Sequence, residues 1–261
     1  MDFVNTLKKC VYLFEQDSRR WGLRLRTALI IAAIPILIML GMVAIVPIPD
    51  LFVWVTAENS WMEWLQFLLI LASSLIFARL SLLLFQSHQA RIGALCLLVA
   101  VGTFFVAGEE IAWGQHIFGW GTPEALEAVN VQQETTLHNI SSAHAIFVYA
   151  VMVAGLFGTV MALGSVWWNK RQQSVLSRLL FPPLCLAPAF FMPFGYRFAR
   201  LFLGIDTLFP DFIFHITKFS EVTELCLYFG LVVFAWLNLR QLRTTAPSRV
   251  EQLVSNSEIK P

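Results

Sequence analysis

Six long runs of apolar residues constrain this chain more than any other feature. A helix that crosses the hydrocarbon core of a bilayer needs about 20 apolar residues. The runs approach or exceed this length at residues 28–46, 61–85, 92–111, 143–167, 179–203 and 219–237. Composition agrees, because 57% of the 261 residues are hydrophobic and 13% are charged, whereas about a quarter are charged in soluble domains. We therefore predict an all-α, polytopic membrane protein with about six transmembrane helices.

Charged residues divide the loops between these runs into two sets. Basic residues follow the second, fourth and sixth runs, and acidic residues gather in the loops between. The basic set includes Arg91, Lys170, Arg171, Arg178, Arg240 and Arg243, and the acidic set includes Asp50, Glu58, Glu124, Glu127, Glu134, Asp206 and Asp211. Because cytoplasmic loops retain Lys and Arg, we predict that both termini are cytoplasmic and that the acidic loops face outward.

The predicted spans divide the chain into three parts. Residues 1–27 form a basic cytoplasmic tail, which is either an interfacial helix or a solvated segment. Residues 28–239 form the six-helix membrane domain, with an outer-face loop at 112–141. Residues 240–261 are expected to be a flexible cytoplasmic tail.

Composition also narrows the classes of partner. A net charge of +1 and the lack of a basic patch give no reason to expect nucleic acid. The four cysteines, Cys10, Cys96, Cys185 and Cys226, show no paired spacing typical of zinc sites or disulfides. Membrane lipid is therefore the partner that the composition predicts.

Adjacent glutamates mark the end of the third run. Glu109 and Glu110 stand where the dipole of a helix is negative, so their charge must be offset by a cation, a proton or water. If the helix continues, Trp113 and His116 lie on the same face as Glu109. The alternative is that both acids open a hydrated loop.

The loop that follows carries further polar candidates. Glu134 and His138 are four residues apart, so one helical turn places them on one face. Asn139 can cap the fourth span, which leaves His144 in its first turn. A histidine there is either a neutral base or metal ligand, or a hydrogen-bonded residue of the helix end.

The last two spans bring charge into the membrane. Prolines at 182, 183, 188 and 193 should kink or unwind the fifth span. Arg197 and Arg200 lie near its outer end, where basic residues are rare, and either neutralise the outer glutamates or hold an anionic phosphate. In the sixth span, Glu221 and Glu224 share a face, and an ionisable residue inside a span is a functional hypothesis by default.

Part of the chain resembles a known family. The run from Glu109 to Gln115, the sequence Thr122-Pro123-Glu124 and the run from Gln133 to Asn139 resemble a family of multi-pass bacterial inner-membrane proteins. The resemblance covers mainly residues 108–140, and it implies a bacterial inner membrane and a shared outer-face motif without an activity. The Glu-Glu pair is also similar to that of CAAX-protease-like intramembrane metalloproteases, but Gly114 stands where those proteases have Arg.

These observations lead to a functional hypothesis. We expect an outer-facing polar site of a metal-dependent hydrolase or transferase that acts on a lipid-linked or anionic envelope substrate. The expected catalytic residues are Glu109, Glu110, His138, His144 and Glu224, the substrate-binding residues are Trp113, Gln115, Glu134, Asn139, Arg197 and Arg200, and the ligands of zinc or manganese are Glu110, His138 and Glu221. The alternatives are a proton-coupled transporter and a non-catalytic partner subunit with a structural polar network.

Overall fold

The computed structural model of the chain is almost entirely helical. It describes residues 3–57, 60–128, 130, 134–137, 140–168 and 174–257, and 86% of the chain is helical. Within these ranges the only strand-like feature is an isolated bridge between Asn130 and Ile140. Six helical segments are long and apolar enough to cross a membrane. This confirms the predicted all-α fold class and multi-pass architecture.

Six of the long helices follow the apolar runs, and a seventh, α1, precedes the first run. They are α1 (Phe3–Arg20), α2 (Leu25–Ile45), α4 (Trp61–Gln86), α5 (Ala90–Glu110), α8 (Ser141–Trp168), α10 (Ala187–Leu203) and α12 (Ile213–Ser257). Shorter helices connect them: α3 (Pro49–Thr56), η1 (Ala112–Gly114), α6 (Gln115–Phe118), α7 (Glu124–Glu127), α9 (Val175–Leu180), η2 (Leu184–Leu186), α11 (Ile205–Leu208) and η3 (Pro210–Phe212). The sixth span is longer than the apolar run suggests, because α12 starts before it and continues beyond it.

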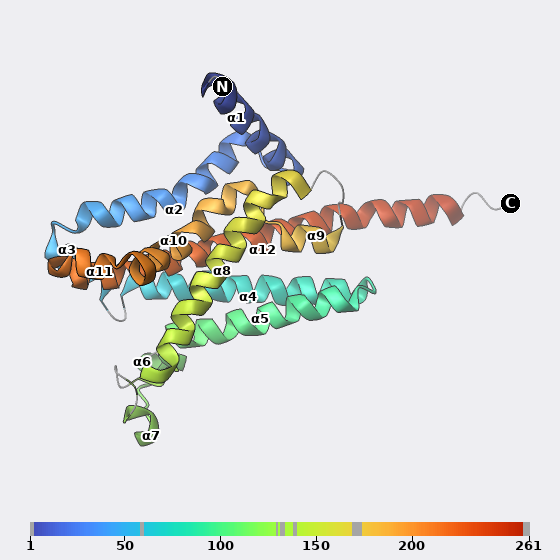
Figure 1. The fold of residues 1–261 in the computed structure, drawn as a ribbon. Helices are drawn as coiled ribbons and strands as arrows, with labels where there is room; N and C mark the ends of the chain where they lie inside the picture. The colour runs from blue at the N-terminus through green and yellow to red at the C-terminus, as the bar shows by residue number, and fades with distance from the viewer. Residues whose placement is uncertain are drawn as a thin grey trace.

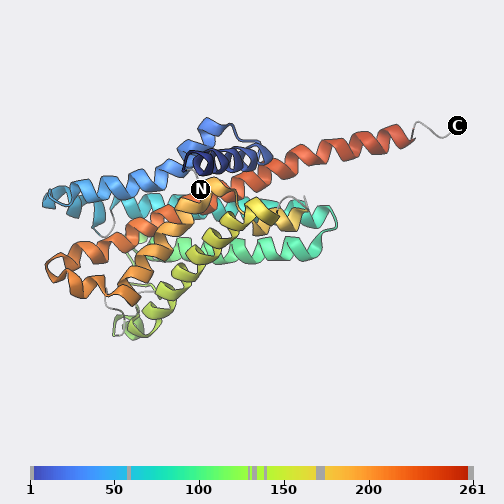
Figure 2. The same cartoon turned by 45° about the horizontal axis from the view of Figure 1, so that its top comes forward.

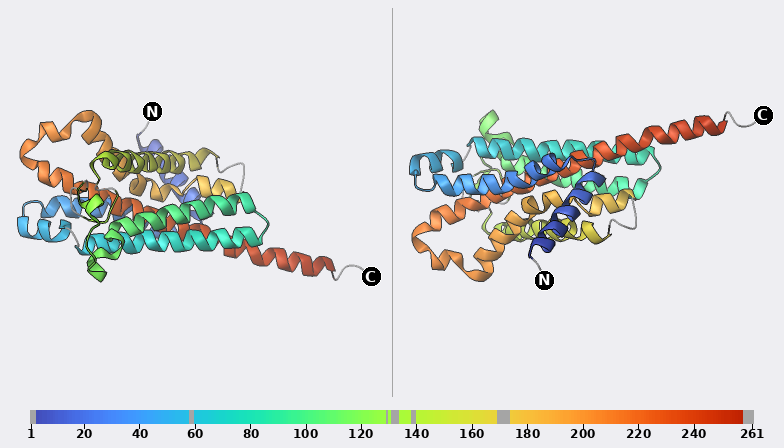
Figure 3. Two further views of the ribbon diagram at one scale, coloured as in Figure 1. Left: turned by 90° about the horizontal axis from the view of Figure 1, so that it is seen from below. Right: turned by 90° about the horizontal axis from the view of Figure 1, so that it is seen from above.

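Helix α12 lies at the centre of the bundle. The hairpin of α4 and α5 packs against one side of it through α4, and the pair of α8 and α10 packs against another side through α10 (Figures 1 and 2). Helix α2 contacts both α10 and α12. Figure 3 shows the molecule from below and from above, with α12 between the pair of α4 and α5 and the pair of α8 and α10. Residues of α12 therefore face neighbours on several sides.

Two glycines allow α8 and α10 to pack closely. A Cβ atom at Gly155 would lie 2.7 Å from the backbone oxygen of Phe190, and one at Gly158 would lie 2.5 Å from the ring of the same phenylalanine. Small residues at helix contacts in membranes permit this approach, because lipid offers no hydrophobic drive for helix association and packing must supply it. The contact fixes the position of α10, which carries Arg197 and Arg200.

The predicted break in the fifth span is present. Pro182 and Pro183 separate α9 from the continuous helical segment of η2 and α10. Pro193 lies buried inside α10, and Pro188 lies in its first turn, where proline is tolerated. The span is therefore two helical pieces, with its longer piece leading to the arginines.

A residue from α1 satisfies the backbone at this break. Asp17 is buried, and its carboxylate accepts hydrogen bonds from the backbone N–H of Leu184 at 2.6 Å and from the hydroxyl of Ser165 at 3.1 Å. Burial raises the pKa of the Asp17 carboxyl, although these two bonds and the charge of Arg20 act in the opposite direction. The first free N–H of the broken span thus has its partner in α1.

Candidate functional site

The two adjacent glutamates at the end of α5 point to different surroundings. Consecutive residues of a helix are rotated by about 100° about its axis. Glu109 therefore meets the loop between α5 and α8, whereas Glu110 meets α12. Each carboxylate belongs to a separate polar group.

Glu109 holds the loop in place. One carboxylate oxygen accepts a hydrogen bond from the Trp113 indole N–H at 2.7 Å, and the other accepts one from the backbone N–H of Leu137 at 2.7 Å. The residue is only 4% exposed. Hydrogen bonds to an ionised group are roughly twice as strong as neutral ones, so this buried carboxylate is a structural anchor.

A reversal of the backbone brings Trp113 back onto α5. The backbone φ angles of Ala112, Trp113 and Gly114 are all positive, at 44°, 55° and 86°. Residues other than glycine seldom adopt positive φ. A Cβ atom at Gly108 would lie 2.8 Å from the Trp113 ring. The helix therefore ends at Glu110, so of the two alternatives the continuous helix through His116 is not present, although Trp113 still reaches Glu109.

Gln115 and Asn130 fasten the rest of the loop. The Gln115 side-chain oxygen accepts hydrogen bonds from the backbone N–H and hydroxyl of Thr135, at 2.7 and 2.8 Å. The Asn130 amide donates to the backbone oxygens of Glu134 and Thr136. We call the set of Glu109, Trp113, Gln115, Thr135 and Leu137 the loop clasp. Its polar groups are committed to closing the loop.

Glu110 belongs to a different polar group, inside the bundle. Its carboxylate accepts a hydrogen bond from the Tyr228 hydroxyl at 2.8 Å and interacts electrostatically with Glu63, Glu221 and Glu224. We call Glu63, Glu110, Glu221 and Glu224 the carboxylate cluster. Its members come from α4, α5 and α12, so the three-helix contact assembles it.

Two cations contact the carboxylate cluster within the described part of the chain. The Arg197 guanidinium, 4% exposed, pairs with Glu224 and also donates to the Thr223 hydroxyl at 2.9 Å. The Lys218 ammonium lies 2.9 Å from one oxygen of Glu221. The other oxygen of Glu221 is buried without a hydrogen-bond partner among the described residues. These two ion pairs involve Glu224 and Glu221, and Glu110 takes part in neither.

Arg200 has a carboxylate partner of its own. Its Nε and Nη2 atoms donate to the two oxygens of Asp206, at 3.0 and 2.8 Å, in a bidentate pair. Asp206 lies in α11, just after the helix that carries Arg200. Both arginines therefore have a carboxylate partner within the chain: Arg197 pairs with a glutamate, which was one of the two roles considered, whereas Arg200 pairs with an aspartate.

The remaining predicted residues lie in the loop, in α8 or outside the residues that the structure describes. Glu134 lies in the loop beside Asn130, and His144 lies exposed in the first turns of α8. His138 and Asn139 lie outside the described residues, as does the side chain of His116. No group of three or more His, Cys, Asp or Glu in the described ranges is arranged to hold a metal ion. Because His138 is outside them, the predicted zinc or manganese site stays a prediction.

Sequence reasoning missed two side chains that the fold brings to the carboxylate cluster. Tyr228 donates to Glu110, and the Gln66 amide donates to the backbone oxygen of Glu221 at 2.9 Å. A signal for both was present: Tyr228 follows Glu224 by four residues, and Gln66 follows Glu63 by three, so each shares a helix face with a glutamate.

No protein-family model matches this chain, and comparisons with curated proteins and with solved structures return no significant match. The geometry of the chain's own residues is thus the basis for a functional assignment.

Proposed function

We propose that this protein lies in the inner membrane of a bacterium with both termini in the cytoplasm. The distribution of charge supports this orientation. The α4–α5 turn and the C-terminal part of α12 carry His88, Arg91, Arg240 and Arg243, whereas the opposite end of the bundle carries Asp50, Glu124 and Asp206. Retention of basic loops in the cytoplasm then puts the loop clasp and the carboxylate cluster in the outer half of the bilayer.

Within this topology, the carboxylate cluster takes up and releases protons, as in a proton-coupled membrane protein. The observation that carries the proposal is the environment of Glu110, which faces three other carboxylates and has a tyrosine hydroxyl, not a cation, as its hydrogen-bond partner. Arg197 pairs with Glu224 and Lys218 pairs with Glu221, so neither of these cations is the partner of Glu110.

An ionised Glu110 that faces other carboxylates inside a membrane bundle would be costly. An unpaired buried carboxylate loses its hydration, and the usual response of a protein is to neutralise it. The unpartnered oxygen of Glu221 supplies a second position that a proton can occupy. Side chains of Glu221 and Glu224 are 26% and 24% exposed, so two of the carboxylates reach the surface of the bundle.

The geometry gives less support to an enzyme that holds an anionic substrate. Arg197 and Arg200, the residues expected to bind phosphate, already have carboxylate partners in Glu224 and Asp206. Two of the three expected metal ligands, Glu110 and Glu221, do interact across the cluster. A divalent cation is thus the competing occupant of the same site, and it must be distinguished from protons by experiment.

The test is infrared difference spectroscopy of the full-length protein in lipid nanodiscs. Acidification should produce the carbonyl stretch of a protonated carboxylic acid in the wild type. The band should be lost or diminished in Glu110→Gln and shifted in Tyr228→Phe, because the phenol no longer donates to that carboxyl group. Elemental analysis of the same samples identifies any zinc or manganese that substitutes for protons.

The adjacent glutamate supplies the matched control. Glu109→Gln changes a carboxylate of the same helix turn that lies in the loop clasp, so the band should persist. The proposal fails if the folded wild type shows no carboxylic acid band at any pH, or if Glu109→Gln removes the band and Glu110→Gln leaves it. Stoichiometric metal that is lost in Glu110→Gln would favour the metal-dependent reading.

A further inference from the structure

Among the described residues, helix α1 is fixed to the bundle through its C-terminal half. Its last turn is held by the two hydrogen bonds of Asp17 and by a bond from the Gln241 amide to the backbone oxygen of Arg20 at 3.2 Å. Trp21, directly after the helix, is 2% exposed and packs against Phe234. The first half of α1 projects away from the bundle at a steep angle to α4 and α5 (Figure 1). The anchoring therefore gives α1 a defined direction.

The projecting half carries an apolar stripe that no other described element covers. Val4, Leu7 and Val11 are 52%, 55% and 50% exposed, and their spacing places them on one face of the helix. Lys9, Gln16 and Arg20 occupy the opposite face by the same geometry. This division of one apolar and one cationic face is typical of helices that lie in the membrane interface.

The charge of α1 and its position both favour a lipid surface as the partner that this apolar stripe contacts. Helix α1 carries four basic residues, Lys8, Lys9, Arg19 and Arg20, and only two acidic ones, Glu15 and the buried Asp17. The first candidate span, α2, begins at Leu25, five residues after α1 ends. The anchored end of α1 is therefore close to a membrane boundary, where cationic side chains meet lipid phosphates.

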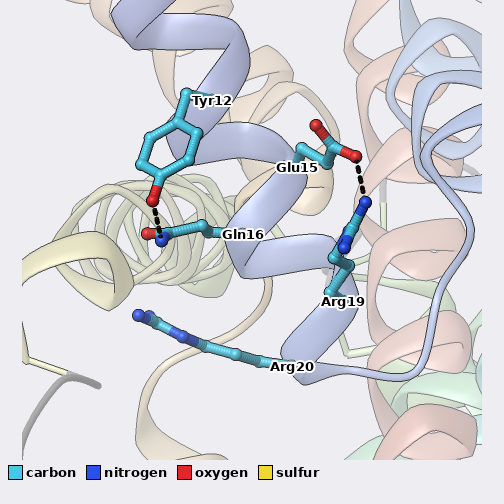
Figure 4. Close-up of a pocket in the computed structure, with 5 residues that line it drawn as sticks. All are labelled: Tyr12, Glu15, Gln16, Arg19 and Arg20. Atoms are coloured by element: carbon cyan, nitrogen blue, oxygen red, sulfur yellow. Dashed lines mark hydrogen bonds and ion pairs between the residues drawn. The ribbon is translucent and has the colours of Figure 1, made fainter.

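A pocket on α1 offers a place for one such headgroup. It is lined by Tyr12, Glu15, Gln16, Arg19 and Arg20 and has a volume of about 430 Å³ (Figure 4). Glu15 pairs with Arg19 at 2.7 Å, and Tyr12 bonds with Gln16 at 2.6 Å. Of the two arginines that line the pocket, Arg19 pairs with Glu15, whereas the Arg20 guanidinium extends below Tyr12 and Gln16 and pairs with none of the other four residues (Figure 4). It is the cation of this pocket that remains available to a phosphate.

We propose that α1 is a membrane-surface helix whose apolar stripe enters the acyl region while its cations bind the headgroups of anionic phospholipid, with Arg20 holding a phosphate at the pocket. The apolar face supplies insertion in any bilayer, and the cationic face supplies preference for anionic lipid. This role is independent of the carboxylate cluster, which lies at the other end of the spans.

The chain contains a natural reporter for this proposal. Cys10 is exposed on α1, three residues after Leu7, whereas Cys96, Cys185 and Cys226 are buried. A fluorophore on Cys10 of the full-length protein, reconstituted at one copy per nanodisc, should be quenched by lipids with brominated acyl chains. Titrating the fraction of brominated phosphatidylglycerol in phosphatidylcholine then gives the preference of α1 for anionic lipid.

Three variants separate the contributions. Lys9→Gln and Arg20→Gln should each weaken the preference for phosphatidylglycerol about fivefold, since one cation near an anionic surface contributes about that factor. The double variant Leu7→Gln/Val11→Gln should lose quenching in both lipids. Arg243→Gln removes an exposed cation of α12 and should change neither result.

Several outcomes would overturn the proposal. Quenching that is absent in every lipid mixture means that α1 lies in water. Quenching that ignores lipid charge in the wild type removes the cationic role. Protection of the label only in nanodiscs that hold two copies would assign the apolar stripe to a contact between copies of this chain. A circular dichroism spectrum confirms that the variants retain their helices.

Discussion

Glu109 and Glu110 are adjacent residues of the same type that lie in contrasting surroundings. In the loop clasp, the Glu109 carboxylate receives two donors at 2.7 Å. In the carboxylate cluster, Glu110 receives one donor, Tyr228, and faces three further acids. A satisfied buried charge stabilises the fold, whereas an unsatisfied one must be neutralised or relieved. The comparison shows that the hydrogen-bond partners of a carboxylate, more than its residue type or depth, determine whether it stabilises the fold or needs to be neutralised.

The largest effect should come from breaking the cluster's main ion pair. Arg197→Leu leaves Glu224 among like charges, and we expect a loss of about 3 kcal/mol of stability at neutral pH, the low end for buried pairs because Glu224 is partly exposed. Thermal unfolding in detergent measures it. Acidification should recover part of the loss, and the double variant Arg197→Leu/Glu224→Leu should be more stable than Arg197→Leu; failure of both would show that Arg197 does not neutralise the cluster.

The adjacent glutamates offer the most direct contrast. Glu109→Ala leaves the Trp113 and Leu137 N–H groups without their acceptor, so we expect a loss of about 2 kcal/mol and faster proteolysis within residues 115–137. Glu110→Ala leaves a single donor, the Tyr228 hydroxyl, without its acceptor and also relieves repulsion among the carboxylates, so we expect a smaller loss than for Glu109→Ala. Chemical denaturation of the two variants side by side provides the measurement, and equal losses would contradict the division between clasp and cluster.

The loop clasp can also be disturbed without changing any charge. Gly108→Ala places a methyl group against the Trp113 ring, and we expect a loss of about 1–2 kcal/mol as the ring shifts from Glu109. Gly102→Ala is the matched control on the same helix, since a Cβ atom there meets nothing within 4 Å. Trp113 is one of nine tryptophans, so differences in emission between Gly108→Ala and the same protein with Trp113→Phe report its environment. A Gly108→Ala protein as stable as the control would mean that the ring moves freely.

Asp17 should give the smallest effect and extends the comparison to a third buried acid. Because burial raises its pKa in the folded protein, its contribution to stability is fully present below about pH 4, its unfolded pKa, and is lost as pH rises through the folded pKa. Asp17→Asn keeps an acceptor for Leu184 without the ionisation. The stability difference between wild type and variant, followed by thermal unfolding against pH, should therefore favour wild type most in acid; a difference that grows toward neutral pH would contradict this.

The fold was predictable because it depends on the length of apolar runs. Each span needs only enough apolar residues in sequence, and the six runs met that condition. The break at Pro182 and Pro183 was predictable for a similar reason, since proline acts locally on the backbone. Candidate polar residues could also be found, because charge inside an apolar segment stands out.

The roles of those residues depended on contacts between distant parts of the chain. Tyr228 reaches Glu110 across 118 positions, and Asp17 reaches Leu184 across 167. The positive φ angles of Ala112 and Trp113 bring the Trp113 indole back to Glu109. These angles oppose the local preference of both residues, and the hydrogen bonds of the folded loop enforce them. No local pattern could separate Glu109 from Glu110 before these contacts were known.

The bond between Asp17 and Leu184 has a consequence for the depth of a charge in the membrane. Pro182 and Pro183 have no N–H group, so the Leu184 N–H is the first backbone donor after the break. It donates to Asp17 of α1, and this bond fixes the start of η2. From Leu184 the helix rises about 20 Å to Arg197. The level at which that guanidinium meets Glu224 is thus set relative to α1, which is not among the six segments long and apolar enough to cross a membrane.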